Sequence, residues 1–208
     1  MKSTNCLFFG DSITFGEYDG VLGGWVDVLK RYSYDKFYNA GKDEVNVFNL
    51  GIGGETTEGL LRRVEVEIAA RTSVEENLVF FFYGANDLAI KNGCEVVSID
   101  QFNLNLEKAI NIAKKITDKV YLISILPISS KVEGVLSPAG KVRTSERVLM
   151  YNEVVRAVAS RCKVELIDLY PLFADREELL SKDGIHPNER GYEVISEVIK
   201  PYIDKYLG

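Results

Sequence analysis

The sequence predicts an α/β fold in which a parallel sheet of five strands is covered by helices on both faces. Short apolar runs alternate along the chain with longer amphipathic segments, the order that repeated strand and helix units produce. Most of the runs are apolar almost throughout, as expected of strands buried on both faces. A chain of 208 residues suits a single core, so we expect residues 1–208 to form one domain.

The five predicted strands are the apolar runs themselves. They cover residues 6–9, 45–50, 78–83, 120–126 and 164–169. Their lengths are typical of strands and too short for independent helices. In a parallel sheet the carboxyl ends of the strands lie at one edge, and ligands bind in the crevice outside that edge.

Amphipathic helices are predicted between the strands and after the last one. They cover residues 57–71, 102–116, 146–161 and 189–206. In the first, Leu60 and Ile68 recur on an apolar face opposite charged side chains. Pro201 has no amide hydrogen to donate, which predicts a kink or break near the end of the last helix. Residues 32–43 and 128–144 are predicted loops, and the second is long enough to be a lid or substrate-binding segment.

Composition and charge exclude several classes of protein. The net charge is −6 and the basic residues are scattered, so we expect no nucleic-acid partner. No apolar stretch approaches the roughly 20 residues of a membrane-spanning helix, and the first residues do not have the pattern of a signal peptide. We therefore expect a cytoplasmic protein. The cysteines, Cys6, Cys94 and Cys162, lack metal or redox spacing and are interpreted as reduced thiols.

The only histidine, His186, follows Asp183 by three residues. A histidine that acts as a general base needs an acceptor for its second ring nitrogen, and a nearby aspartate provides one. Gly184 allows the connection to turn. The alternative interpretation is an ordinary turn before a helix, with Pro187 near its first position and Asn188 as its cap.

A serine stands where the first predicted strand ends. The segment Gly10-Asp11-Ser12 places the Ser12 hydroxyl at the carboxyl edge of the sheet, facing the crevice. The alternative role of Ser12 is that of a helix cap or turn hydroxyl.

Two further strands end in groups that can stabilise a developing oxyanion. Gly54 follows the second strand and can offer its backbone amide at close range, while Asn86 follows the third and carries a side-chain NH2. Alone, each is more typical of a turn. Because nucleophile, base, orienting acid and two oxyanion donors are all expected at one edge, the set favours acyl transfer.

Other chemistries fit the sequence less well. The chain has no G-x-x-x-x-G-K-[ST] segment, and Gly51-Ile52-Gly53-Gly54 lacks the full dinucleotide-binding pattern. One histidine without clustered cysteines or carboxylates beyond Asp183 does not make a zinc site. We predict no metal and no cofactor. A catalytically silent binding module of the same fold is the alternative from another class.

Four blocks of the sequence together resemble the signature blocks of the SGNH or GDSL hydrolases. They are Phe9-Gly10-Asp11-Ser12, Gly54, Gly84-Ala85-Asn86-Asp87 and Asp183-Gly184-Ile185-His186-Pro187. The resemblance implies a three-layer α/β/α fold with a flavodoxin-like strand order, 2-1-3-4-5. It also implies hydrolysis of esters or thioesters without a cofactor. The nucleophile segment differs from the G-x-S-x-G elbow of the α/β-hydrolases.

The same resemblance implies the roles of individual residues. Ser12 is the nucleophile, His186 the general base and Asp183 the acid that orients it. The backbone amide of Ser12 joins Gly54 and Asn86 in the oxyanion hole, although Gly53 is adjacent to Gly54 and the glycine is placed only to within one residue. Because the base must be neutral, we expect activity to rise through about pH 6.5.

The remaining predictions concern the surroundings of the site. Asp11 and Asp87 are expected to brace the loops and not to react. Trp25, Gly53 and Ile185 are predicted to contribute to the substrate pocket, together with residues 15–22 and 128–144. The expected substrate is a small ester or thioester of the kinds cleaved by short-acyl esterases, lysophospholipases, arylesterases or thioesterases, with a carbohydrate O-acetyl ester as the alternative.

Overall fold

The core of the structure is a parallel sheet of five strands in the order β2-β1-β3-β6-β8. The computed structural model describes residues 2–72 and 74–208; Met1 and Ser73 of the predicted 1–208 domain lie outside the described residues. The strands are β1 (Ser3–Gly10), β2 (Glu44–Gly51), β3 (Glu76–Phe82), β6 (Val120–Ile123) and β8 (Glu165–Ile167). Numbered among themselves these are strands 2-1-3-4-5, which confirms the predicted class and order.

Both faces of the sheet are covered, which explains why most of its strands are apolar over most of their length. Alternate residues of β1 point to opposite sides, so Phe8 packs in one core cluster and Phe9 in the other. Phe8 stacks on Phe80 of the neighbouring strand with ring centroids 4.4 Å apart, and Phe80 stacks in turn on Tyr121 at 4.6 Å. Aromatic side chains thus bind three adjacent strands together beneath one helical layer.

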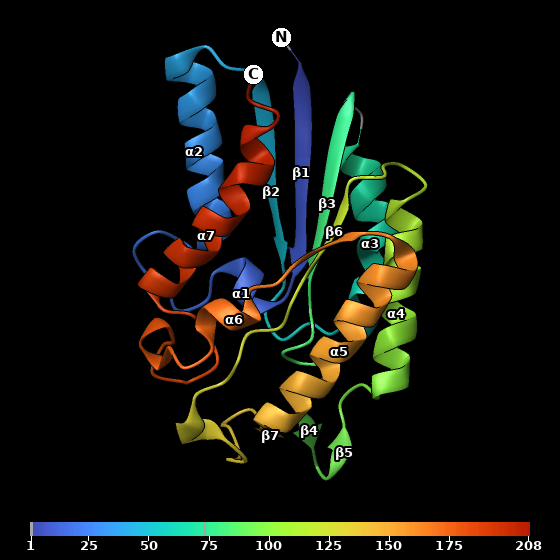
Figure 1. The fold of residues 1–208 in the computed structure, drawn as a ribbon, viewed down its shortest axis with the longest axis vertical. Helices are drawn as coiled ribbons and strands as arrows, with labels where there is room; N and C mark the ends of the chain where they lie inside the picture. Colours follow the sequence, from blue (N-terminus) through green and yellow to red (C-terminus); the bar gives the residue numbers. More distant parts are fainter. Residues whose placement is uncertain (1, 73) are drawn as a thin grey trace.

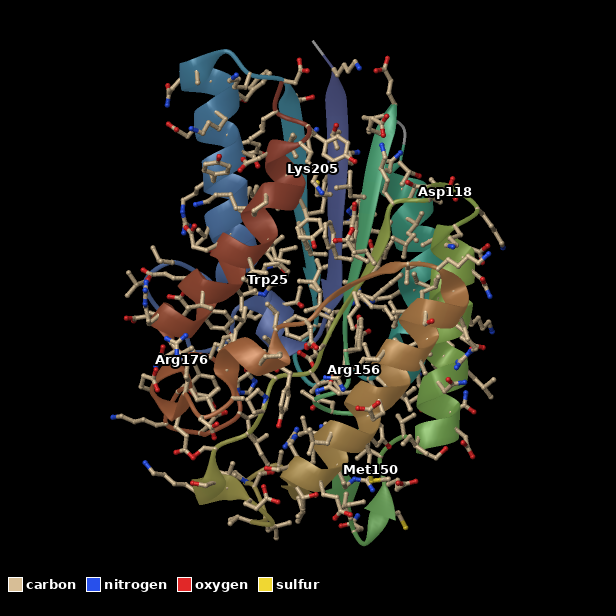
Figure 2. The ribbon with its side chains drawn as sticks, in the orientation of Figure 1. Trp25, Asp118, Met150, Arg156, Arg176 and Lys205 are labelled. Atoms are coloured by element: carbon tan, nitrogen blue, oxygen red, sulfur yellow. The ribbon has the colours of Figure 1, made fainter. Side chains whose placement is uncertain are left out.

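Helices cover the sheet on both sides (Figure 1). The first layer contains α2 (Trp25–Ala40) and α7 (Glu189–Asp204), and the second contains α3 (Thr57–Arg71), α4 (Ile99–Ala113) and α5 (Ser145–Cys162). Side chains fill the space between the sheet and each layer (Figure 2). The four predicted helices are confirmed, with ends shifted by a few residues.

One predicted loop and one predicted helix break are not found. Residues 32–43 were expected to form a loop, but α2 continues to Ala40 because its inner stripe, which includes Leu29 and Ser33, is buried against the sheet. Gly41 then ends the helix in the left-handed conformation, with φ of 63°. Pro201 does not break α7, which runs to Asp204. The proline lies in the last turn, on the exposed side, where one lost hydrogen bond is easily tolerated.

Shorter elements lie beyond the carboxyl ends of the strands. They are α1 (Ser12–Phe15), β4 (Ile90–Lys91), β5 (Cys94–Glu95), the 3-10 helix η1 (Ser130–Val132), β7 (Lys141–Val142), α6 (Tyr170–Phe173) and the 3-10 helix η2 (Glu177–Leu179). Strand β7 pairs with β4, so the segment predicted as a long loop is anchored in a small second sheet. Among residues 2–72 and 74–208, no helix is long and apolar enough to cross a membrane.

Candidate active site

Ser12 is the first residue of α1 and follows β1, an interior strand between β2 and β3, with Asp11 as the connection. The side chain of Asp11 caps this short helix by accepting from the amide of Ile13 at 3.0 Å. A Cβ on Gly10 would lie 1.9 Å from Oγ1 of Thr14. Only glycine therefore allows the turn to close tightly enough to present Ser12 at the edge of the sheet.

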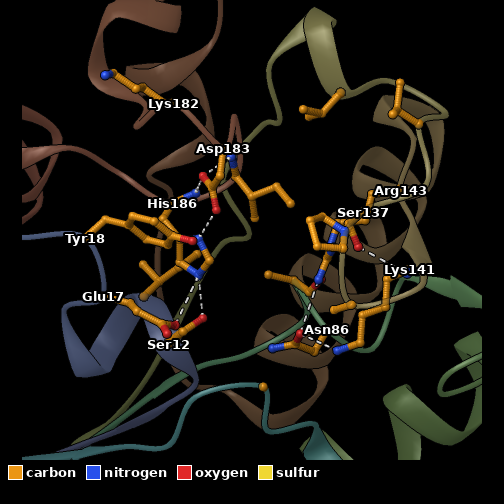
Figure 3. Close-up of a pocket in the computed structure, with 18 of the residues that line it drawn as sticks. Ser12, Glu17, Tyr18, Asn86, Ser137, Lys141, Arg143, Lys182, Asp183 and His186 are labelled. Atoms are coloured by element: carbon orange, nitrogen blue, oxygen red, sulfur yellow. Dashed lines mark hydrogen bonds and ion pairs between the residues drawn. The ribbon is translucent and has the colours of Figure 1, made fainter.

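The Ser12 hydroxyl contacts the only histidine of the chain. Its Oγ lies 2.7 Å from Nε2 of His186, although 174 residues separate the two along the sequence. On the other side of the ring, Nδ1 of His186 lies 2.5 Å from Oδ2 of Asp183. The structure thus brings the three residues into one continuous hydrogen-bonded chain (Figure 3).

Asp183 is held in its ionised form by its neighbours. Partial burial raises the pKa of its carboxyl, but hydrogen bonds from His186, from the amides of Ile185 and His186 and from Ser181 outweigh burial, and the net pKa is well below the ordinary value. Both amides donate to Oδ1 at 3.0 Å and the Ser181 hydroxyl donates to the same oxygen at 2.7 Å. Oδ2 is left for the imidazole, which fixes the direction of the ring.

Asn86 follows β3 and lies across the site from His186. Its Nδ2 donates weakly to Oδ2 of Asp11, at 3.3 Å, and to the carbonyl oxygen of Glu55, at 3.2 Å. Its Oδ1 accepts from Nζ of Lys141 at 2.8 Å and from the guanidinium of Arg143 at 3.2 Å. The two cations therefore orient the amide, and the NH2 group faces the side of Ser12 (Figure 3).

Asp11 and Asp87 lie beneath the site and are buried. Burial raises the pKa of Asp11 to about 6, against the opposing effects of the Ile13 amide and of nearby positive charges. Burial raises the pKa of Asp87 to about 7, against hydrogen bonds from the amide and hydroxyl of Thr57. Thr57 is the first residue of α3, so Asp87 ties this helix to the end of β3.

Glu17 and Tyr18, which follow α1 in the chain, approach His186 from the solvent side. Oε2 of Glu17 lies 3.7 Å from Nε2 of His186. The ring of Tyr18 lies over the imidazole, with centroids 5.0 Å apart and an angle of 37° between the planes. Tyr18 has a φ of 71°, a left-handed conformation that is costly for a bulky residue and common at functional sites. Both lie in the segment predicted to border the pocket, but neither was singled out.

A cavity of about 500 Å³ opens beside Ser12 and His186. Gly54, Asn86, Asp183 and Ile185 also line it. Much of its wall is apolar and comes from the last residue of η1 and the segment that follows, namely Val132, Val135, Leu136, Pro138 and Ala139. The long connection predicted as a substrate-binding segment thus forms one side of the cavity.

Two residues predicted for the pocket do not line it. Trp25 is fully buried at the start of α2, where Nε1 donates to the carbonyl oxygen of Ile13 at 3.1 Å and the ring packs edge-on against Phe8. It supports the helix that carries Ser12 from below. Gly53 lies outside the lining, whereas Gly54, with a φ of 76°, turns toward the cavity.

Lys141 and Arg143 were missed as individual site residues. Both line the cavity and both contact Asn86, from a segment 55 residues or more further along the chain. The available signal was the pair of basic residues inside the predicted substrate-binding segment. Within residues 2–72 and 74–208 no group of three or more histidine, cysteine or acidic side chains is arranged to hold a metal ion.

The chain matches one family model and several known proteins over most of its length. The sequence model of the GDSL-like Lipase/Acylhydrolase family matches residues 8–194. The crystal structure of a lipase/acylhydrolase from Enterococcus faecalis has 30% sequence identity and a TM-score of 0.76, over 100% of this chain and 98% of that one. A GDSL esterase/lipase of Arabidopsis thaliana is 24% identical over 229 residues, covering 100% of this chain and 89% of the relative. Lipoprotein YqeF of Bacillus subtilis (strain 168) is 25% identical over 201 residues, covering 85% of this chain and 77% of the relative.

Proposed function

The chain belongs to the GDSL-like lipase/acylhydrolase family and is a carboxylic ester hydrolase, and from this premise we propose that it cleaves esters through an acyl intermediate on Ser12. One observation carries the proposal. Oγ of Ser12 lies 2.7 Å from Nε2 of His186, while Nδ1 of the same ring lies 2.5 Å from Asp183. This is the geometry of a serine activated by a histidine base that an aspartate orients.

In the first half of the reaction, Nε2 of His186 takes the hydroxyl proton as Oγ of Ser12 bonds to the acyl carbon. The carbonyl oxygen becomes negative and receives hydrogen bonds from the backbone amides of Ser12 and Gly54 and from the NH2 group of Asn86. The tetrahedral intermediate then expels the alcohol, which leaves with the proton held by His186. The product of this half is the ester between the acyl group and Ser12.

In the second half, water replaces the alcohol. His186 takes one proton from water while the water oxygen attacks the acyl carbon, and the proton returns to Oγ of Ser12 as the acid leaves. Asp183 stays ionised throughout, because its hydrogen bonds lower its pKa, and it stabilises the imidazolium that forms in each half. Asp11 and Asp87 support the loops that carry the reacting groups.

We propose esters of short aliphatic acids as substrates. The cavity of about 500 Å³ lies in the range of small-molecule sites, and its apolar wall between Val132 and Ala139 suits an acyl chain of modest length. Acyl esters and acyl-CoA thioesters of increasing chain length would measure this preference. We expect kcat/KM to peak at short chains and to fall once the chain outgrows the cavity. A maximum at long chains would reject the assignment.

Labelling with a fluorophosphonate tests the nucleophile. We expect the probe to modify Ser12, as located by peptide mass spectrometry, and Ser12→Ala to lose both labelling and hydrolysis of p-nitrophenyl acetate. Ser160→Ala, an exposed serine of α5, is the matched control and should keep both. Hydrolysis that persists in Ser12→Ala would show that the acyl group is transferred by another route.

A further inference from the structure

A group of positive charges lies on one wall of the cavity. Lys141 is part of β7 and Arg143 follows it, and both line the cavity. In the second sheet, Lys141 stands directly opposite Lys91 of β4. Figure 3 shows Lys141 and Arg143 across the site from Ser12 and His186. Lys91 is exposed and does not itself line the cavity. We call Lys141 and Arg143, together with Lys91 next to Lys141, the basic wall.

The basic wall is not neutralised by ion pairs in the part of the chain that the structure describes. Lys141 donates to the amide oxygen of Asn86, and Arg143 donates to the same oxygen and to the carbonyl of Ala85, so these acceptors are uncharged. The neighbouring cation Arg147 differs, because it pairs with Glu95 at 2.8 Å. Like charges placed directly opposite each other in an antiparallel pair repel.

The acids closest to the basic wall compensate only part of its charge. Asp11 lies behind Asn86, and Asp87 is buried below it, with pKa values raised to about 6 and about 7. Near neutral pH a fraction of each is protonated, more of Asp87 than of Asp11. Burial, together with the charges of Arg143 and Lys91, lowers the pKa of Lys141, so an anion placed beside its ammonium group would be bound favourably.

Acids stand beside the histidine on the opposite wall, where the cation Lys182 is exposed and extends away from the site (Figure 3). Glu17 and Asp183 lie on the side of His186, and Glu17 is 3.7 Å from its Nε2. A negative group on the substrate is repelled from that side and attracted to the basic wall. Lys141 uses one of its three N–H donors on Asn86, which leaves two for a ligand in the cavity.

We propose that the substrates carry a carboxylate or phosphate group close to the ester bond, and that Lys141, supported by Arg143 and Lys91, binds it. The inference rests on the proposed function, because Asn86 as oxyanion donor places the ester carbonyl beside Lys141. The anionic group belongs either to the acyl part, as in a monoester of a dicarboxylic acid, or to the alcohol part, as in an acylated hydroxyalkyl phosphate.

Paired substrates test the proposal. For the acyl part, monoethyl succinate is compared with its neutral isostere ethyl levulinate; for the alcohol part, acetoxyethyl phosphate is compared with methoxyethyl acetate. In the unmodified protein we expect a higher kcat/KM for the anionic member of one pair, and a preference that shrinks as salt is added. A higher kcat/KM for the neutral member of both pairs would overturn the proposal.

Lys141→Met removes the charge and keeps an unbranched side chain that is one heavy atom shorter. Both members of a pair lose the support that Lys141 gives Asn86, but only the anionic member also loses a charged hydrogen bond. We expect the ratio of kcat/KM, anionic over neutral, to fall about 10- to 100-fold. Lys141→Arg should restore most of this ratio. Lys108→Met removes an equal charge from an exposed residue of α4 that does not line the cavity and should leave the ratio unchanged.

The outcomes separate this proposal from the proposed function. Equal losses on both members of each pair would show that Lys141 acts only through Asn86, and would overturn the assignment of the substrate class. If the unmodified protein is not labelled by the fluorophosphonate and hydrolyses none of the esters, the acyl-Ser12 mechanism is rejected instead. The unfolding midpoint of each variant is also measured. It shows whether a change in the ratio of kcat/KM results from misfolding.

Discussion

Oδ2 of Asp183 lies 2.5 Å from Nδ1 of His186, and the other oxygen of the same carboxylate is held by two backbone amides at 3.0 Å. Because Asp183 and His186 belong to one short turn, their geometry is set locally. The long-range step is the docking of this turn beside Ser12. The orientation of the imidazole and its placement beside Ser12 are therefore separate properties, which substitutions can test separately.

Asp183→Asn should lower kcat by about 10²–10⁴-fold while the fold is retained, because an amide presents a donor or a neutral acceptor to His186 and no longer stabilises the imidazolium. Turnover of a p-nitrophenyl ester checks this expectation. Asp175→Asn, at an exposed position on a nearby loop, serves as the control. A loss of less than tenfold in Asp183→Asn would remove the residue from the catalytic group.

Asn86→Ala should lower kcat by about 10²–10³-fold with little change in KM, because an oxyanion donor acts mainly in the transition state. Steady-state kinetics with a neutral short-chain ester separate the two parameters. Asn39→Ala, an exposed asparagine of α2, is the control. A variant in which KM rises and kcat is kept would show that Asn86 binds the ground state of the substrate.

Gly10→Ala should destabilise the protein by about 1–3 kcal/mol, the usual cost of overpacking. The new Cβ would lie 1.9 Å from Oγ1 of Thr14 and 2.9 Å from the carbonyl oxygen of Phe82, so α1 must move. Denaturant unfolding measures the loss. A Cβ on Gly20 meets nothing within 4 Å, so Gly20→Ala should change stability little. Equal stabilities of the two variants would show that α1 can shift without cost.

Asp87→Asn should make stability less dependent on pH. Burial raises the pKa of Asp87 to about 7, and its Oδ2 has no hydrogen-bond partner among the described residues. In the unfolded chain the pKa is about 4, so as pH rises the unfolded state releases this proton first and the native protein loses stability between about pH 4 and pH 7. The asparagine variant lacks this loss.

Urea unfolding of the native protein and of Asp87→Asn at a series of pH values checks this expectation. The free energy of unfolding of the variant, relative to that of the native protein, should increase across this window and then level off. Asp11 titrates in both proteins; because its charge helps to raise the pKa of Asp87, removing the Asp87 charge also eases the ionisation of Asp11 and adds to the difference in the same direction. A difference that is constant with pH would mean that Asp87 has an ordinary pKa in the folded state.

Much of the fold could be predicted because local patterns agree with the tertiary structure. The five apolar runs are strands buried on both faces, and the amphipathic segments bury a single stripe. The prediction failed in α2, where polar and aromatic residues from Tyr32 onward have no strong helical pattern. Burial of the preceding turns, from Trp25 to Leu29, carries the helix through them.

The proximity of several site residues could also be predicted, because it depends on the strands of the sheet. Ser12, Gly54 and Asn86 each follow a strand, and parallel strands end at one edge, so their proximity follows from topology. Trp25 was misplaced because a tryptophan near a predicted site suits a pocket or a core equally well. Its burial beneath Ile13 depends on the packing of α2 against the sheet.

By itself, the sequence determined the class of fold, the positions of the strand-end groups and the pairing of the only histidine with its aspartate, because these depend on periodicity and on short spacings. Only the tertiary structure decided what surrounds them. The pairing of β7 with β4 brings Lys141 and Arg143 to Asn86 from far along the chain, and the same pairing sets the charge of the cavity wall. A long connection has no periodicity that reveals its partner, so its contribution to the site emerges only when the chain is folded.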